Sequence, residues 1–195
     1  MAAVLIVVAV VVLLALIIGF SYNSLVRRRN RTREAWSQID VELKRRHDLI
    51  PNLVSTVKGY AAHESGTLEA VTASRAAAVS AGATSDPAKV ATAENGLSAS
   101  LRSLFAVSEN YPALRAQEGF LALQEQLAAT EDKLEYARHY YNGSARDYNT
   151  AIQSLPGSLL AGPFGFNSVE FFQTDPTDRE TPVVDFVNTA PPAAK

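Results

Sequence analysis

The chain has 195 residues, 47% of them hydrophobic and 19% charged, which is enough for one ordinary domain with a short added segment. It has no cysteine, and this excludes disulfide scaffolds, cysteine-ligated zinc, iron–sulfur clusters and thiol nucleophiles. The formal net charge of −2 combines a basic segment, residues 27–46 with eight basic and three acidic side chains, with an acidic remainder, a distribution that argues against nucleic-acid binding.

Residues 2–20 form an uninterrupted apolar stretch of fourteen Val, Leu, Ile or Phe residues, four Ala and Gly19. As a helix this stretch is about 28 Å long, close to the roughly 30 Å hydrocarbon core of a bilayer. A cleaved secretory signal is the alternative, but such a signal has a charged start, a shorter apolar core and a small-residue cleavage site. We therefore expect residues 1–23 to be an uncleaved transmembrane anchor.

Five arginines follow the apolar stretch and are called the arginine collar: Arg27, Arg28, Arg29, Arg31 and Arg33. Positively charged flanks stay in the cytoplasm, so we expect a short N-terminus outside the cell membrane and the rest of the chain in the cytoplasm. The collar is also expected to attract anionic lipid headgroups. An RNA-binding arm is the alternative interpretation, but beside a membrane span the role in topology is favoured.

Apolar residues three and four apart predict a helix over residues 24–62. One seven-residue register on it contains Trp36, Leu43, Ile50 and Val57. Arg46 is the one charged member of a second apolar register. Because proline removes a backbone hydrogen bond from a helix interior, we expect a bend at Pro51.

Two shorter helices are expected next, over residues 64–81 and from Asp86-Pro87, an N-cap followed by proline, to about residue 109. A long fourth helix is predicted over residues 112–155, with this seven-residue register: Phe120, Leu127, Leu134, Tyr141 and Tyr148. The register continues through Asn142-Gly143, a pair typical of hairpin turns, so a helix is favoured there. The fold predicted is all-α: a transmembrane helix followed by an antiparallel up-and-down four-helix bundle over residues 24–157.

Packing the first and fourth helices as antiparallel neighbours fixes a register between them. It predicts these contacts: Trp36 with Tyr141, Leu43 with Leu134, Ile50 with Leu127 and Val57 with Phe120. The same register brings Arg46 near Glu131 and Asp40 near Arg138, two pairs of opposite charge. We predict a partly buried Arg46–Glu131 pair, and the alternative is two side chains that extend separately into solvent.

The C-terminal part divides into two segments. Residues 158–172 are apolar, aromatic and broken by Gly and Pro, and they follow the membrane end of the expected bundle. We favour a strap packed on the bundle over a segment that dips into lipid headgroups. Residues 173–195 are polar, acidic and contain several prolines, so we expect a disordered tail.

Several distinct motifs lie along the first and fourth predicted helices and beyond them. They are Trp36-x-x-Ile39-Asp40, Leu49-Ile50-Pro51-Asn52-Leu53, Glu109-Asn110-Tyr111-Pro112, Tyr141-Asn142, Tyr148-Asn149, Gly165-Phe166 and Pro182-Val183-Val184-Asp185-Phe186. In combination they resemble the LemA family over nearly the whole chain. The resemblance implies a bacterial inner-membrane protein with a cytoplasmic helical bundle and no agreed biochemical activity. Family members are often encoded beside membrane metalloproteases, which makes such a protease a candidate partner.

No catalytic or metal-binding motif is complete. His63-Glu64 begins like a zinc-protease helix but lacks the second histidine four residues later, and Glu135 with His139 supplies one pair where di-iron bundles need two. We therefore expect no enzyme, cofactor or metal, but a scaffold or adaptor that acts through protein contacts. The alternative is a membrane-organising protein that binds anionic lipid through the arginine collar and the C-terminal aromatic segment. Because heptad surfaces also pair between chains, a homo-oligomer stays open.

Overall fold

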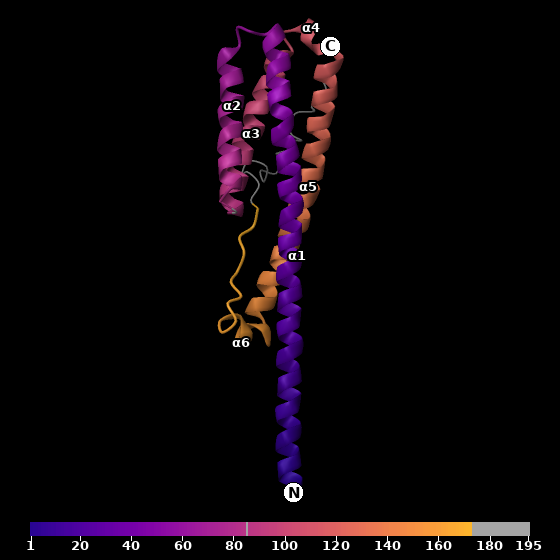
Figure 1. Cartoon of the computed structure of the whole chain (residues 1–195), viewed down its shortest axis with the longest axis vertical. Coiled ribbons are helices and arrows are strands. Elements are labelled where there is room, and N and C mark those ends of the chain that lie inside the picture. The colour runs from indigo at the N-terminus through magenta and orange to yellow at the C-terminus, as the bar shows by residue number, and fades with distance from the viewer. Residues whose placement is uncertain (85, 173–195) are drawn as a thin grey trace, which may run out of the picture.

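The computed structural model of the protein describes residues 1–84 and 86–172, so the disordered tail predicted for residues 173–195 lies outside the described part. This part is all-helical, as predicted, and contains no strand. Its helices are α1 (Ala2–Tyr60), α2 (Ser65–Gly82), α3 (Pro87–Ser108), α4 (Pro112–Arg115), α5 (Glu118–Gln153) and α6 (Gly157–Ala161) (Figure 1).

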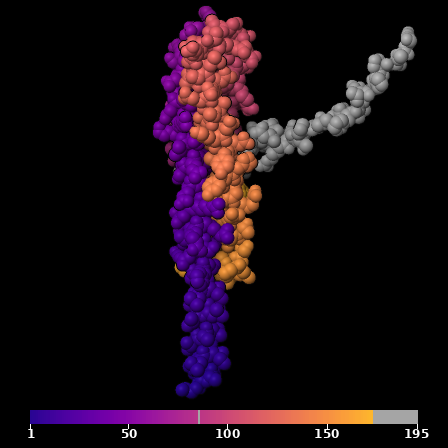
Figure 2. Space-filling model, turned by 90° about the vertical axis from the view of Figure 1, so that its right-hand side faces the viewer, coloured from indigo at the N-terminus to yellow at the C-terminus, as the bar shows by residue number. Residues whose placement is uncertain are grey.

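Helix α1 joins the apolar stretch and the first amphipathic helix into one element of 59 residues. Its length is about 88 Å at the rise of an α-helix. The apolar N-terminal part extends alone beyond the other helices, and Figure 2 shows it as an isolated column. Within the described residues, it is the one segment long and apolar enough to cross a membrane, by length and composition, and its side chains are exposed. The helix continues through Pro51.

Helices α1 and α5 lie side by side and run in opposite directions (Figure 1). The rings of Trp36 and Tyr141 meet edge to face with their centroids 5.2 Å apart. Leu43 and Leu134 lie in the same buried cluster. The other two predicted contacts, farther from the apolar stretch, lie together in a second cluster that contains Ile50, Leu127, Val57 and Phe120. Eight of the nine predicted core residues are buried, and Trp36 is half-buried. The seven-residue spacing therefore predicted which faces of these two helices meet.

Helices α2 and α3 form a second antiparallel pair, and α2 also contacts α1 (Figure 1). As predicted, α3 begins at a capped proline, because the carboxylate of Asp86 accepts hydrogen bonds from the backbone N–H groups of Ala88 and Lys89. The apolar stripe of α3 is buried in the core. The structure thus has two antiparallel helix pairs, and a closed four-helix bundle over residues 24–157 stays a prediction.

The helix predicted over about residues 112–155 is wrong at its start. Pro112 starts only the single turn α4, and α5 begins afresh at Glu118. The break occurs because Gln117 has an extended backbone and caps α5, with its side-chain oxygen accepting a hydrogen bond from the Phe120 N–H at 2.9 Å. Helix α5 continues through Asn142-Gly143, as predicted, and ends at Gln153.

The segment after α5 turns back and runs along the helices (Figure 1). Two asparagines of α5 hold its backbone. Asn149 exchanges two hydrogen bonds with Val169, at 2.9 and 3.0 Å, and Asn142 exchanges two with Phe172, both at 2.9 Å. Phe166 and Phe172 are buried beneath this path. These are the contacts of a strap packed on the helices, and we call residues 158–172 the strap.

Candidate functional site

Charged side chains from four helices meet inside the helical part and form what we call the buried polar cluster. Its members are Arg46 and His47 of α1, Arg75 of α2, Glu94 and Ser98 of α3, and Glu131 and Arg138 of α5. Glu94 is its centre and is 0% exposed. Its two carboxylate oxygens lie 3.2 Å from Arg46 Nη1 and 2.7 Å from His47 Nε2. A carboxylate at this depth needs such partners, because burial of an isolated charge is strongly unfavourable.

Further hydrogen bonds extend the cluster to the neighbouring helices. Arg46 Nη2 donates to Ser98 Oγ at 2.8 Å, and Arg75 Nε donates to the backbone carbonyl of His47 at 2.7 Å. The charged groups are thus directed at one another and at the backbone. In the described part, no group of three or more acidic or histidine side chains is arranged to hold a metal ion. The cluster is an arrangement that fixes helix positions.

One of the two predicted ion pairs forms and the other does not. Arg46 Nη1 lies 3.2 Å from Glu131 Oε2, with the arginine buried and the glutamate half-exposed, which is the predicted contact. The Asp40–Arg138 pair is wrong. Arg138 Nη1 instead lies 3.6 Å from Glu131 Oε1, and its guanidinium carbon lies 4.8 Å from the ring centroid of Phe172 in the strap. Asp40 has no ion-pair partner among the described residues, and burial raises its pKa above the ordinary value.

The role of Glu94 was not predicted from the sequence, although its position within an apolar stripe indicates a buried charge. It lies on the same face of α3 as Val90, Leu97 and Leu101, at the spacings that place residues on one side of a helix. An acidic residue inside an apolar stripe needs a basic counterpart in another stripe, and Arg46 is the one charged member of its register. Searching for the partner of Arg46 on every helix would have found Glu94 as well as Glu131.

A groove of about 620 Å³ lies on the outer face of α1 and α5, and we call it the outer groove. It is lined by Ser37, Gln38, Val41, Glu42, Asp132, Lys133, Tyr136 and Ala137. Val41 and Tyr136 are 65% and 71% exposed. Glu42 Oε2 is buried and has no hydrogen-bond partner among the described residues. Exposed apolar and aromatic groups, bordered by charges of both signs, are typical of protein contact surfaces.

The arginine collar lies on α1 just after the apolar stretch, and two of its members contact aromatic rings of the protein. The guanidinium carbon of Arg29 lies 4.9 Å from the ring centroid of Phe166 in the strap. Arg31 Nε donates a hydrogen bond to the Tyr140 hydroxyl at 3.1 Å. The other three are exposed: Arg27, Arg28 and Arg33. The collar is therefore partly a packing element and partly a free basic surface.

The region that contains the cluster, the outer groove and the strap is also the region shared with known proteins. A family model described as the LemA family matches residues 35–186. The chain belongs to the LemA family. The match begins within α1, just after the collar, so the LemA region includes the buried polar cluster, the outer groove and the strap but neither the collar nor the apolar stretch.

Curated relatives of this LemA-family chain cover most of its length. It is 26% identical over 186 residues to magnetosome protein MamQ 2 of Paramagnetospirillum magneticum, covering 84% of this chain and 68% of the relative. The figures are the same for magnetosome protein MamQ of Magnetospirillum gryphiswaldense. Protein LemA of Metamycoplasma hominis is 25% identical over 159 residues, covering 80% of this chain and 71% of the relative.

Proposed function

We propose that this LemA-family chain is a single-pass membrane protein that acts as a scaffold or adaptor through protein contacts, without catalysis of its own. Residues 2–20 cross the inner membrane of a bacterial cell, the short N-terminus lies outside, and the helical part lies in the cytoplasm. The observation that carries the proposal is the continuity of α1, which leads from an exposed apolar stretch directly into the packed helices. The collar on the far side of that stretch supports the orientation.

The outer groove is the surface proposed to receive a protein partner. Val41 and Tyr136 offer exposed apolar contact area, and Glu42 offers a carboxylate oxygen that a donor from a partner can bind. Aromatic residues are enriched at the centres of protein interfaces. The names of the MamQ relatives refer to the magnetosome and not to a reaction, which supports a role of this kind. A membrane metalloprotease is the candidate partner, and a homo-oligomer of the chain is the alternative.

Orientation is tested by thiol labelling, because the chain has no cysteine of its own. In spheroplasts, a membrane-impermeant thiol reagent should label a cysteine inserted directly after Met1 without permeabilisation and Glu125→Cys only after it. The reverse pattern would overturn the proposed topology. Labelling of both variants without permeabilisation would overturn the cytoplasmic location.

The adaptor role is tested by crosslinking in native membranes. A photoreactive crosslinker on Tyr136→Cys in the outer groove should capture a defined protein. The matched control is Arg102→Cys, which is exposed on α3 and does not line the groove, and it should capture that protein much less. Capture of the chain by itself alone would support a homo-oligomer and contradict the adaptor. Equal capture from both positions would contradict the outer groove as the contact surface.

Direct lipid binding is the second candidate function, and a specific contact favours it. Phe164 of the strap lies edge to face against Tyr22, beside the collar, with a centroid distance of 5.1 Å, and its ring is still largely exposed. Co-sedimentation of residues 21–195 with anionic vesicles, after circular dichroism shows that this part is helical, tests it. Loss of binding when the five collar arginines become Gln would support lipid binding, and no sedimentation at any anionic-lipid fraction would discard it.

A further inference from the structure

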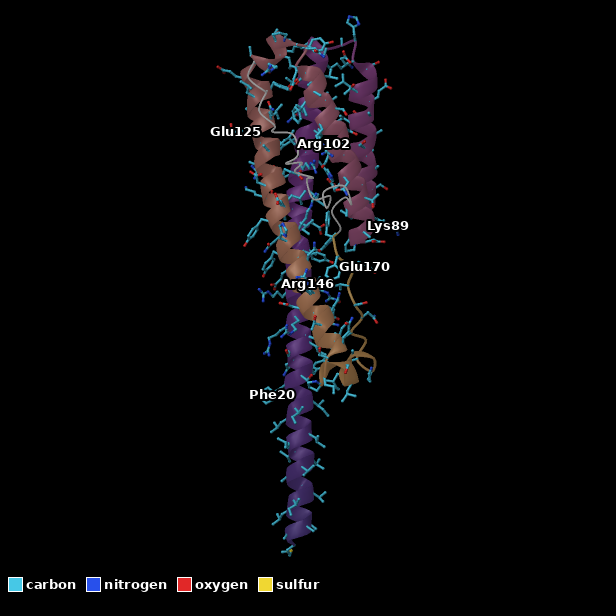
Figure 3. The ribbon with its side chains drawn as sticks, turned by 180° about the vertical axis from the view of Figure 1, so that it is seen from behind. Phe20, Lys89, Arg102, Glu125, Arg146 and Glu170 are labelled. Carbon is cyan, nitrogen blue, oxygen red and sulfur yellow. The ribbon has the colours of Figure 1, made fainter. Side chains whose placement is uncertain are left out.

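A second groove lies where α1 leaves the apolar stretch, on its α5 side, and we call it the membrane-end groove. It has a volume of about 690 Å³. Its walls come from α1, from the last turns of α5 and from the residues that lead into α6: Ile17, Phe20, Ser21, Ser24, Leu25, Arg28, Arg146, Asp147, Thr150, Ala151, Ser154, Leu155, Pro156 and Gly157. Figure 3 shows Arg146 and Phe20 at different heights along the molecule.

The α1 wall changes from apolar to hydroxyl to basic along its length. Phe20, Ser24 and Arg28 follow one another at four-residue spacing, so they lie in one row on the same face of the helix. Phe20 is 72% exposed at the apolar end. At 1.5 Å per residue, the Cα atoms of Phe20 and Arg28 are separated by about 12 Å along the helix axis, so the apolar and basic ends of the row are well apart.

The α5 wall has the same order. Because α5 is antiparallel to α1, its basic residue comes first in the sequence and its apolar residue last, yet the two walls have the same order in space. Arg146, Thr150 and Ser154 again follow at four-residue spacing, and Leu155, which is 76% exposed, comes next. The two walls therefore place their guanidiniums at one end of the groove, their hydroxyls in the middle and their apolar side chains at the other end.

This double gradient matches one kind of ligand. We propose that the membrane-end groove binds one anionic phospholipid, with its phosphate between Arg28 and Arg146 and its acyl chains against Phe20 and Leu155. The inference rests on the proposed membrane anchoring. The two arginines and Asp147 give the groove a net positive charge of one, and neither arginine forms an ion pair with another residue of the described part.

The groove shares Arg28 with the arginine collar but otherwise differs from the lipid surface formed by the collar and the strap. Arg29 and Arg31 contact Phe166 and Tyr140, whereas neither these arginines nor these rings line the membrane-end groove. Arg146 of α5 lies outside the collar in sequence. A free phosphate ion would use only the basic end and leave the apolar end exposed, so a lipid fits the complete groove better.

The test is lipid retention by the full chain, purified in mild detergent and measured by native mass spectrometry. Wild type should retain phosphatidylglycerol in preference to phosphatidylcholine. Arg146→Gln should lower the affinity for phosphatidylglycerol roughly five-fold, the effect expected from one charge at a lipid surface. The matched control, Arg102→Gln, removes an arginine that is also exposed but lies far from Arg146 and Phe20 (Figure 3), and it should bind as wild type.

A second variant and a competition experiment distinguish a lipid site from a phosphate site. Leu155→Asn should weaken retention of both lipids, because it removes apolar contact without changing charge. Equal retention by Arg146→Gln and wild type, or an equal loss in Arg102→Gln, would overturn the inference. Displacement of the lipid by millimolar glycerol phosphate would show a phosphate site and overturn the lipid site. Retention of neither lipid by wild type would also overturn the lipid site, whereas failure of the anchoring proposal itself would appear separately, as recovery of the chain in the soluble fraction before detergent is added.

Discussion

Arg46 of α1 and Glu94 of α3 form an ion pair at 3.2 Å in which both side chains are withdrawn from solvent. His47 and Glu131 add further contacts on either side. The pair joins two helices whose contact the heptad pattern did not predict. Its energetic role differs from that of an exposed pair such as Lys44 with Asp48, which bridges one turn of α1.

Breaking the buried pair should destabilise the protein far more than breaking the exposed one. Glu94→Gln keeps the shape but leaves the Arg46 guanidinium short of a counter-charge in the core, which should lower the free energy of unfolding by about 3–5 kcal/mol. The matched control, Asp48→Asn, should cost less than about 1 kcal/mol. Chemical denaturation of the two variants in detergent measures both values, and equal losses would contradict a structural role for the cluster.

Releasing the strap should be possible with one side chain. Asn149→Ala removes two hydrogen bonds to Val169 and leaves its backbone groups unpaired. At about 1 kcal/mol for each bond, we expect a loss of roughly 2 kcal/mol. Limited proteolysis should also cut residues 162–172 faster. Asn52→Ala, an exposed asparagine on α1, is the control, and a similar cleavage rate in both variants would argue against this attachment.

Stability should depend on pH through Tyr141. Its hydroxyl donates to the backbone carbonyl of Glu170 at 2.7 Å, and burial raises the pKa of Tyr141 to about 12. Because the unfolded chain ionises near pH 10, the stabilisation is complete below pH 10 and is lost as the pH rises toward 12. Wild type should therefore exceed Tyr141→Phe in stability at pH 8, and the difference should shrink above pH 10. A constant difference across this range would refute the assignment.

The start of α6 should not accept a larger residue. A Cβ atom on Gly157 would collide with the backbone carbonyl of Ala151 and approach the Leu25 side chain at 3.4 Å. Gly157→Ala should cost about 1–3 kcal/mol, because backbone or helix must move to make room. Gly162→Ala is the control, since a Cβ there meets nothing within 4 Å. Thermal unfolding of the two variants should show a lower midpoint only for Gly157→Ala.

Sequence reasoning succeeded where one face of a helix repeats. The seven-residue registers of α1 and α5 predicted the Trp36–Tyr141 contact and the Arg46–Glu131 pair, because two antiparallel helices with long apolar stripes have few ways to align. It failed where one side chain decides a local conformation. The cap formed by Gln117 starts α5 at Glu118, yet glutamine is not a typical N-cap residue.

The hydrogen bonds that attach the strap to α5 were not predicted, and for a different reason. Asn142 and Asn149 each follow a tyrosine of the core register and lie seven residues apart, so the repeated Tyr-Asn pair was visible. The role of these asparagines depends on the path of a segment distant in sequence, and helical periodicity does not predict that path. In the same segment, Phe172 lies against the guanidinium of Arg138, which pairs with Glu131 and not with Asp40. Contacts with irregular backbone were therefore beyond prediction, even though the residues that make them were already singled out.

The unbroken course of α1 has a mechanical consequence. No joint separates the part proposed to cross the bilayer from the part that packs on α5, so the two rotate together as one lever. A typical tilt of about 20° from the bilayer normal would carry the distal end of α1 sideways by roughly 20 Å. A change in bilayer thickness that alters this tilt would thus displace all the helices packed on α1 sideways, parallel to the membrane.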